Sequence, residues 1–147
     1  MSLPAFNSGG DLPPGVYRAT MEEVMLRFGS GTPSRERAAS ALLRIYQTAK
    51  NTGRLERIVI FGSFVTAKAM PNDVDVILVM NDGFRLESCD HFTAAIFDHE
   101  RAQREIGASV FWIRPSLLIA DAMPEFISRW QKKRDGGLRG IVEVMND

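Results

Sequence analysis

Two short apolar runs near the middle of the chain constrain its fold more than any other feature. Residues 57–61 (RIVIF) and 74–80 (VDVILVM) are dominated by β-branched and other apolar side chains. Runs of this length and composition are typical of largely buried strands. Helical signals lie on both sides of each run, so the sequence predicts a buried sheet with helices packed against it.

Capping residues and periodicity predict the other elements. Thr20 lies three residues before Glu23, which is the spacing of a capping box, and the helix that it begins should end at Gly29. Thr32-Pro33 predicts the start of a second helix, for which Gly53 is a natural end. The remaining expected elements are a turn and short helix over 62–72, a helix over 90–106, a strand over 109–113, a helix from Pro124 and a strand over 140–144.

This order predicts one α/β (α+β) domain with a short mixed sheet flanked by helices. We expect the domain to span residues 16–147, after an irregular N-terminal arm over residues 1–15, where turn-forming Asn, Ser, Gly and Pro residues gather. At 45% apolar and 24% charged residues, the composition is that of an ordinary globular protein.

Charge and cysteine content limit the partners and the cellular compartment that we expect. Eighteen basic and eighteen acidic residues cancel, which mildly disfavours long nucleic acid as a partner. Cys89 is the only cysteine, no apolar run reaches the length of about 18 residues that a membrane span needs, and the N-terminus does not resemble a signal peptide. We therefore expect a cytoplasmic protein without a membrane partner.

The segment between the two central strands begins with Gly62-Ser63. Glycine allows a sharp turn with no Cβ in the way of a ligand. The following backbone N–H groups, if they open a short helix, form a site for phosphate oxygens, and the Ser63 hydroxyl adds a donor. Lys68 follows and could reach a triphosphate, although a solvated lysine on a short helix explains it as well.

The same segment ends with Asp73 and Asp75. Side chains two residues apart in a strand share a face, so both carboxylates should point the same way while Val74 and Val76 point into the core. Carboxylate oxygens are ligands that Mg²⁺ prefers, together with waters and substrate phosphates. Either motif alone is common in ordinary turns, but their combination at the ends of two buried strands predicts a metal–nucleotide site.

At these residues the chain resembles the DNA polymerase β-like nucleotidyltransferase superfamily, whose signature is Gly-Ser, about ten residues, and Asp-x-Asp. Leu12-Pro13-Pro14-Gly15, residues 61–66 (FGSFVT) and residues 71–75 (PNDVD) look like a small bacterial branch of it. The resemblance implies a minimal nucleotidyltransferase fold. It also implies that Asp73 and Asp75 are catalytic and bind Mg²⁺, with Mn²⁺ as an alternative, while Gly62 and Ser63 hold the phosphates of a nucleoside triphosphate.

Two functions follow from the resemblance. The first is transfer of a nucleoside monophosphate from the triphosphate to the hydroxyl of an unknown acceptor, either a small RNA, a protein or a small molecule. Active members of the superfamily usually carry a third carboxylate on a later strand. The later strand expected here, residues 109–113, contains no acidic residue. Glu143 is the nearest substitute, but its spacing from the other motif residues does not assign it that role. The second function is therefore a catalytically inactive domain that binds nucleotide or a protein partner, as in a toxin–antitoxin or defence system.

A basic cluster near the C-terminus has two interpretations. Arg129, Lys132 and Lys133, with Arg134 and Arg139 nearby, could meet phosphates of an RNA acceptor. The favoured interpretation is the solvated face of a helix whose other face buries Phe126, Ile127 and Trp130.

Overall fold

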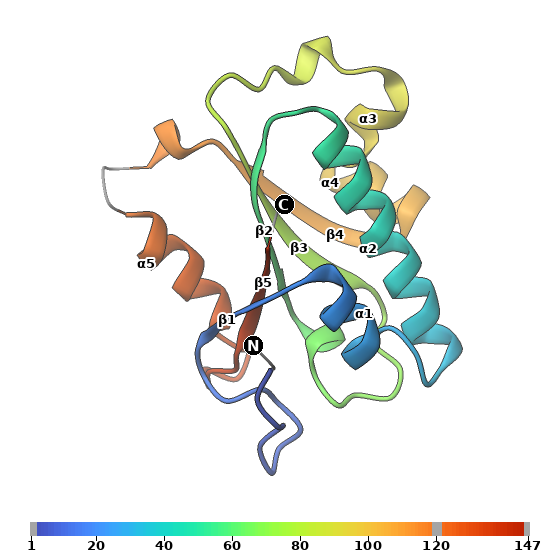
Figure 1. The fold of residues 1–147 in the computed structure, drawn as a ribbon, viewed down its shortest axis with the longest axis vertical. Helices are drawn as coiled ribbons and strands as arrows, with labels where there is room; N and C mark the ends of the chain where they lie inside the picture. The colour runs from blue at the N-terminus through green and yellow to red at the C-terminus, as the bar shows by residue number, and fades with distance from the viewer. Residues whose placement is uncertain (1–2, 119–121, 146–147) are drawn as a thin grey trace.

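The computed structural model describes residues 3–118 and 122–145, which form a mixed five-stranded sheet with helices on both faces (Figure 1). The strand order is β1-β5-β2-β3-β4, with parallel pairing at the two outer positions and antiparallel pairing in the centre. The strands are β1 (Val16–Ala19), β2 (Leu55–Phe61), β3 (Val74–Met80), β4 (Ala108–Ile113) and β5 (Ile141–Val144). This architecture confirms the expected fold class.

The helices divide into two layers. On one face of the sheet, α1, α2 and the segment that contains α3 and α4 cover the larger apolar core, whereas α5 lies on the opposite face over a smaller cluster (Figure 1). The α-helices are α1 (Met21–Phe28), α2 (Pro33–Asn51), α3 (His91–Ala95), α4 (His99–Arg101) and α5 (Met123–Ser128). The short 3₁₀ and π segments are η1 (Ser63–Val65), η2 (Leu86–Ser88), η3 (Ala102–Ile106), η4 (Pro115–Leu117) and η5 (Arg129–Gln131).

The predicted helix starts coincide with the observed caps. Thr20 and Glu23 form a reciprocal capping box on α1, and the Thr32 hydroxyl accepts the Arg35 N–H at the start of α2. These signals are local, so the sequence was sufficient to place both helices.

The structure corrects two predictions of secondary structure. The strand β1 precedes α1, where the sequence predicted no strand, because its four residues are held only by parallel pairing with distant β5. The single helix predicted over 90–106 is broken around Phe97, whose carbonyl accepts a hydrogen bond from Trp112 Nε1 at 3.1 Å. Asp98 then caps a new helix by accepting the Arg101 N–H.

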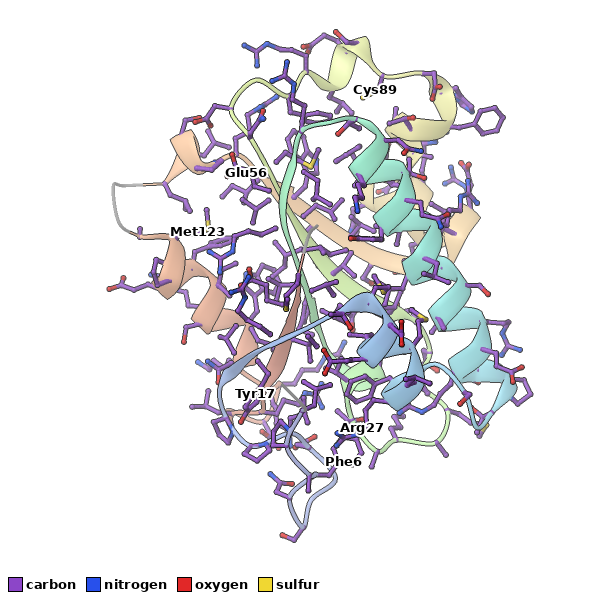
Figure 2. The ribbon with its side chains drawn as sticks, viewed as in Figure 1. Phe6, Tyr17, Arg27, Glu56, Cys89 and Met123 are labelled. Carbon is purple, nitrogen blue, oxygen red and sulfur yellow. The ribbon has the colours of Figure 1, made fainter. Side chains whose placement is uncertain are left out.

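The N-terminal arm packs on its own domain, a point that the sequence left open. Leu12 is completely buried, and the Gly10 carbonyl accepts the Ala67 N–H at 2.8 Å. Figure 2 shows Phe6 beside Arg27 of α1, whose guanidinium carbon lies 4.4 Å from the ring centroid. No helix among the described residues is both long and apolar enough to cross a bilayer.

Candidate functional site

A cleft of about 700 Å³ opens beside the end of β2 and the start of β3, on the face of the sheet that α5 partly covers. All five residues that the sequence singled out line this cleft: Gly62, Ser63, Lys68, Asp73 and Asp75. The antiparallel pairing of β2 with β3 explains this, because the end of one strand lies beside the start of the other. The fold therefore brings both halves of the predicted motif together.

Gly62 is required by its backbone and by its neighbour. Its φ of 77° and ψ of −165° lie in a region that is essentially restricted to glycine. A Cβ at this position would lie 2.9 Å from Cγ of Asp75 and would overlap the carboxylate oxygen Oδ2. The glycine thus leaves the space that the Asp75 carboxylate occupies.

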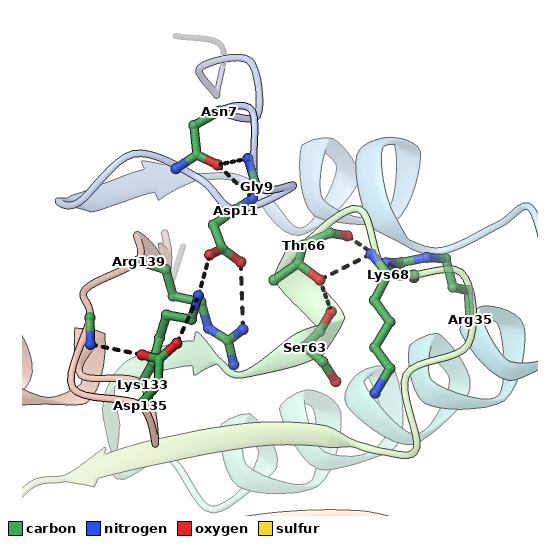
Figure 3. Close-up of polar contacts among 11 residues, drawn as sticks. Asn7, Gly9, Asp11, Arg35, Ser63, Thr66, Lys68, Lys133, Asp135 and Arg139 are labelled. Carbon is green, nitrogen blue, oxygen red and sulfur yellow. Dashed lines mark hydrogen bonds and ion pairs between the residues drawn. The ribbon is translucent and has the colours of Figure 1, made fainter.

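The turn after Gly62 is closed by its own hydrogen bonds (Figure 3). The Thr66 hydroxyl donates to the Ser63 carbonyl at 2.7 Å and accepts the Lys68 N–H at 3.1 Å. Ser63 itself begins the short helical turn η1, as the sequence predicted for residues after Gly62. These contacts place Ser63 and Lys68 along one wall of the cleft.

Arg35 of α2 holds this turn through hydrogen bonds to its backbone. The side chain is almost completely buried, and burial lowers the pKa of its guanidinium. The guanidinium donates to four backbone carbonyls at 2.5 to 3.0 Å, those of Phe28, Phe64, Thr66 and Lys68. A buried cation with several carbonyl partners holds the loop in one conformation.

The two carboxylates have different surroundings. Asp75 lies within β3, opposite Phe61 on β2 and Ser109 on β4. Burial, and then the nearby charge of Asp73, raise the pKa of Asp75 to about 6, although Arg139 and Arg134 partly oppose this. A buried carboxylate with a second carboxylate beside it forms a site that a bound cation would stabilise.

Asp73 belongs to a hydrogen-bonded group at the rim of the cleft. Its Oδ2 accepts from Gln103 Nε2 at 3.1 Å and lies 3.1 Å from the Ser109 hydroxyl. The same hydroxyl lies 2.8 Å from Gln103 Oε1, so its one hydrogen serves one of the two acceptors at a time. Ser109 and Gln103 therefore orient Asp73 toward the cleft from β4 and η3.

Glu143 does not line the cleft with this pair. Glu143 on β5 accepts from Arg57 Nε at 3.1 Å and forms an ion pair with the same guanidinium. Within residues 3–118 and 122–145, no group of three or more His, Cys, Asp and Glu side chains is arranged to hold a metal ion.

A basic wall, formed by Lys132, Lys133, Arg134 and Arg139, lines the cleft together with the carboxylates. The interpretation as a solvated helix face was wrong for these residues, because the helical segment ends at Gln131. A turn follows, closed by a bridge between Lys132 and Leu138. The turn folds back along the mouth of the cleft because it must return the chain to β5.

Asp11 of the N-terminal arm fixes two members of the basic wall (Figure 3). Its carboxylate lies 2.9 Å from Lys133 Nζ and 3.5 Å from an Arg139 guanidinium nitrogen. Asp11 is 8% exposed, and its backbone N–H donates to the Asn7 side chain at 3.1 Å. The arm thereby holds the two cations beside Ser63 and Lys68 in a shared hollow.

Comparison with known proteins shows the family. The model of a family of unknown function, DUF6932, matches residues 4–145. The chain belongs to this family. No curated protein matches it in sequence. A solved structure of a "putative nucleotidyltransferase" from Sulfolobus solfataricus is similar at a TM-score of 0.36 and 18% identity, over 75% of this chain and 96% of the other. No functional assignment rests on that likeness.

Two groups of cleft residues in this DUF6932 protein were not predicted from sequence. The sequence shows the basic wall as a cluster of charged residues. Its position in the cleft depends on the turn that returns the chain to β5, and this turn was not predicted. Phe61, Phe111 and Trp130 also line the cleft, whereas the sequence placed them in apolar strands and on a buried helix face. The apolar character of these side chains correctly predicts that they pack against other residues, but it does not predict that they are partly exposed.

Proposed function

We propose that this protein is a Mg²⁺-dependent nucleotidyltransferase that moves a nucleoside monophosphate from a nucleoside triphosphate to an acceptor hydroxyl. One observation supports this most directly: a carboxylate pair, a Gly-Ser turn and a basic wall share one cleft. The carboxylates suit a hard divalent cation, while the turn and the basic wall suit the phosphates that accompany such a cation. The resemblance to the polymerase β-like superfamily points to the same reaction.

The donor set fits Mg²⁺ in its chemistry. Asp73 and Asp75 would supply two anionic oxygens, and waters and substrate phosphates would complete the coordination, as is usual for this ion. Burial, and then repulsion from Asp73, raise the pKa of Asp75, and a bound cation would favour the charged form of this carboxylate. A bound Mg²⁺ would neutralise phosphate charge and polarise the α-phosphorus.

The residues of the chain would act mainly by positioning. The Gly62-Ser63 turn and Lys68 would hold the β- and γ-phosphates, and the basic wall would neutralise charge on the leaving pyrophosphate. The acceptor oxygen would form a bond to the α-phosphorus as the bond to the bridging oxygen breaks. Pyrophosphate would leave, and the hydroxyl proton would pass to solvent.

A second function is favoured because Glu143 is paired with Arg57 and, among the described residues, no third acid joins Asp73 and Asp75 in a group arranged to hold a metal ion. Without that acid to activate the acceptor, the cleft would bind nucleotide and catalyse no transfer. Both functions require nucleotide binding, and only the first requires turnover.

The two functions are distinguished by calorimetry followed by a transfer assay. We expect Mg-ATP, or another of the four common ribonucleotides, to bind the wild type, and we expect at least tenfold weaker binding to Asp73→Asn/Asp75→Asn. Asp135→Asn removes an exposed acid of the same cleft and serves as the matched control. Transfer of labelled nucleotide to RNA or protein, with release of pyrophosphate, would establish the enzyme. Binding without transfer would support the second function, and no binding at millimolar nucleotide would overturn both.

A further inference from the structure

Three aromatic side chains form a partly exposed surface inside the cleft, which we call the aromatic shelf. It consists of Phe61 at the end of β2, Phe111 on β4 and Trp130 on η5. The Trp130 ring lies 4.7 Å from that of Phe61 and 5.1 Å from that of Phe111, between centroids. The His99 ring lies 4.9 Å from Phe111 and extends this surface.

Phe111 of the shelf is more exposed than its neighbour on the same face of the sheet. Phe111 is in register with Ile77, so both lie on the face of the sheet that α5 covers. Ile77 is completely buried in the cluster that contains Ile127 of α5, whereas Phe111 is 39% exposed. The packing that buries the centre of this face thus leaves aromatic surface open to the cleft.

Strand register places Asp75 between the phosphate-binding turn and the exposed part of the shelf. Phe61, Asp75 and Ser109 lie side by side across three strands, with Gly62 and Ser63 beyond them at one end. Phe111 lies two residues past Ser109 in the opposite direction, a separation of roughly 7 Å along the strand. This is the length scale of a ribose, which joins a base to its α-phosphate.

We propose that the aromatic shelf stacks the base of the donor nucleotide whose phosphates lie at the Gly62-Ser63 turn, an inference that rests on the proposed function. Rings that are already packed against each other lose little entropy when they receive a planar ligand. Stacking recognises the π-face that every base has, so the shelf selects a nucleotide over bare polyphosphate and discriminates weakly among bases.

The test compares Mg-ATP and Mg-UTP with Mg-tripolyphosphate, which carries three linked phosphates without the ribose and base. We expect both nucleotides to bind the wild type about tenfold more tightly than tripolyphosphate. Phe111→Leu, which keeps an apolar side chain, should remove most of this advantage and leave tripolyphosphate binding unchanged. Phe92→Leu is the matched control, because Phe92 is 75% exposed on α3 and does not line the cleft.

Tryptophan fluorescence gives a second readout that leaves the shelf intact. The other tryptophan, Trp112, packs against the core on the opposite face of the sheet, so Trp112→Phe leaves Trp130 as the reporter. Mg-ATP should quench Trp130 emission and Mg-tripolyphosphate should not.

The outcomes separate this inference from the proposed function. The stacking role would be overturned if the wild type bound nucleotides and tripolyphosphate with equal affinity. It would also be overturned if Phe111→Leu kept full nucleotide affinity and nucleotide did not quench Trp130. In both cases the phosphate site would stand. If neither nucleotide nor tripolyphosphate binds the wild type, the proposed function and this inference both fail.

Discussion

Asp75 carries a carboxylate in the cleft whose ionisation depends on the fold. Its pKa in the folded protein is about 6, against 3.8 for an unperturbed aspartate. The folded protein therefore binds more protons than the unfolded chain between about pH 4 and 6. Without a divalent cation, this carboxylate lowers stability progressively as the pH rises through that range.

Asp75→Asn should consequently stabilise the metal-free protein. We expect the free energy of unfolding at pH 8 to rise by about 1 to 2 kcal/mol, after allowance for the partial exposure of the site, with little change at pH 4. Urea denaturation in the presence of a chelator at both pH values measures this. Asp135→Asn should leave the pH profile unchanged, and a variant less stable than wild type at pH 8 would contradict the prediction.

At the scale of elements, α2 and the turn after β2 form one unit through Arg35. The N-terminal turn of α2 carries this side chain into the core, where it satisfies carbonyls from three different loop residues and from the end of α1. The conformation of the turn after Gly62 therefore depends on a helix that does not itself line the cleft.

Arg35→Lys should show this dependence, because an ammonium cannot reach all four carbonyls. We expect the free energy of unfolding to fall by about 2 to 4 kcal/mol, since buried carbonyls lose charge-assisted hydrogen bonds. Arg37→Lys on the same helix is the control, because Arg37 is exposed and should change stability by less than about 0.5 kcal/mol. Similar denaturation midpoints for both variants would show that the bracing is unimportant.

At the scale of the whole molecule, the charge is balanced overall and divided locally. Equal numbers of acidic and basic residues leave no net charge, yet Lys68 and the four cations of the basic wall line one cleft. The polyphosphate ligand that we propose would thus be attracted by a local potential, which salt screens.

Arg134→Gln tests this local potential. Arg134 lines the cleft, and its charge contributes to the environment of Asp75. We expect Mg-ATP affinity to fall about three- to tenfold and to depend less steeply on salt. Calorimetric titrations at several salt concentrations measure both, with Arg37→Gln as a charge-matched control outside the cleft. An unchanged salt dependence would place Arg134 outside the phosphate site.

Much of the fold and half of the candidate site could be predicted from local sequence. The capping residues of α1 and α2 act within one turn of helix, and the apolar runs of β2 and β3 identify buried strands without knowledge of their partners. The two-residue period of a strand places Val74 and Val76 in the core and Asp75 on the opposite face. The spacing from Gly62 to Asp75 then brings the turn and the carboxylates together.

Contacts between distant segments decided the rest. Bonding of Phe97 to Trp112 broke a helix that its own periodicity favoured, and pairing with β5 converted residues 16–19 into a strand. The return of the chain to β5 directed the basic wall into the cleft, and the extent of α5 left Phe111 partly exposed. The sequence by itself determined α1, α2, β2 and β3 and the Gly-Ser and Asp-x-Asp residues, because capping and strand alternation act over a few residues. Only the tertiary structure decided what faces them, because those neighbours meet through contacts that no short-range pattern encodes.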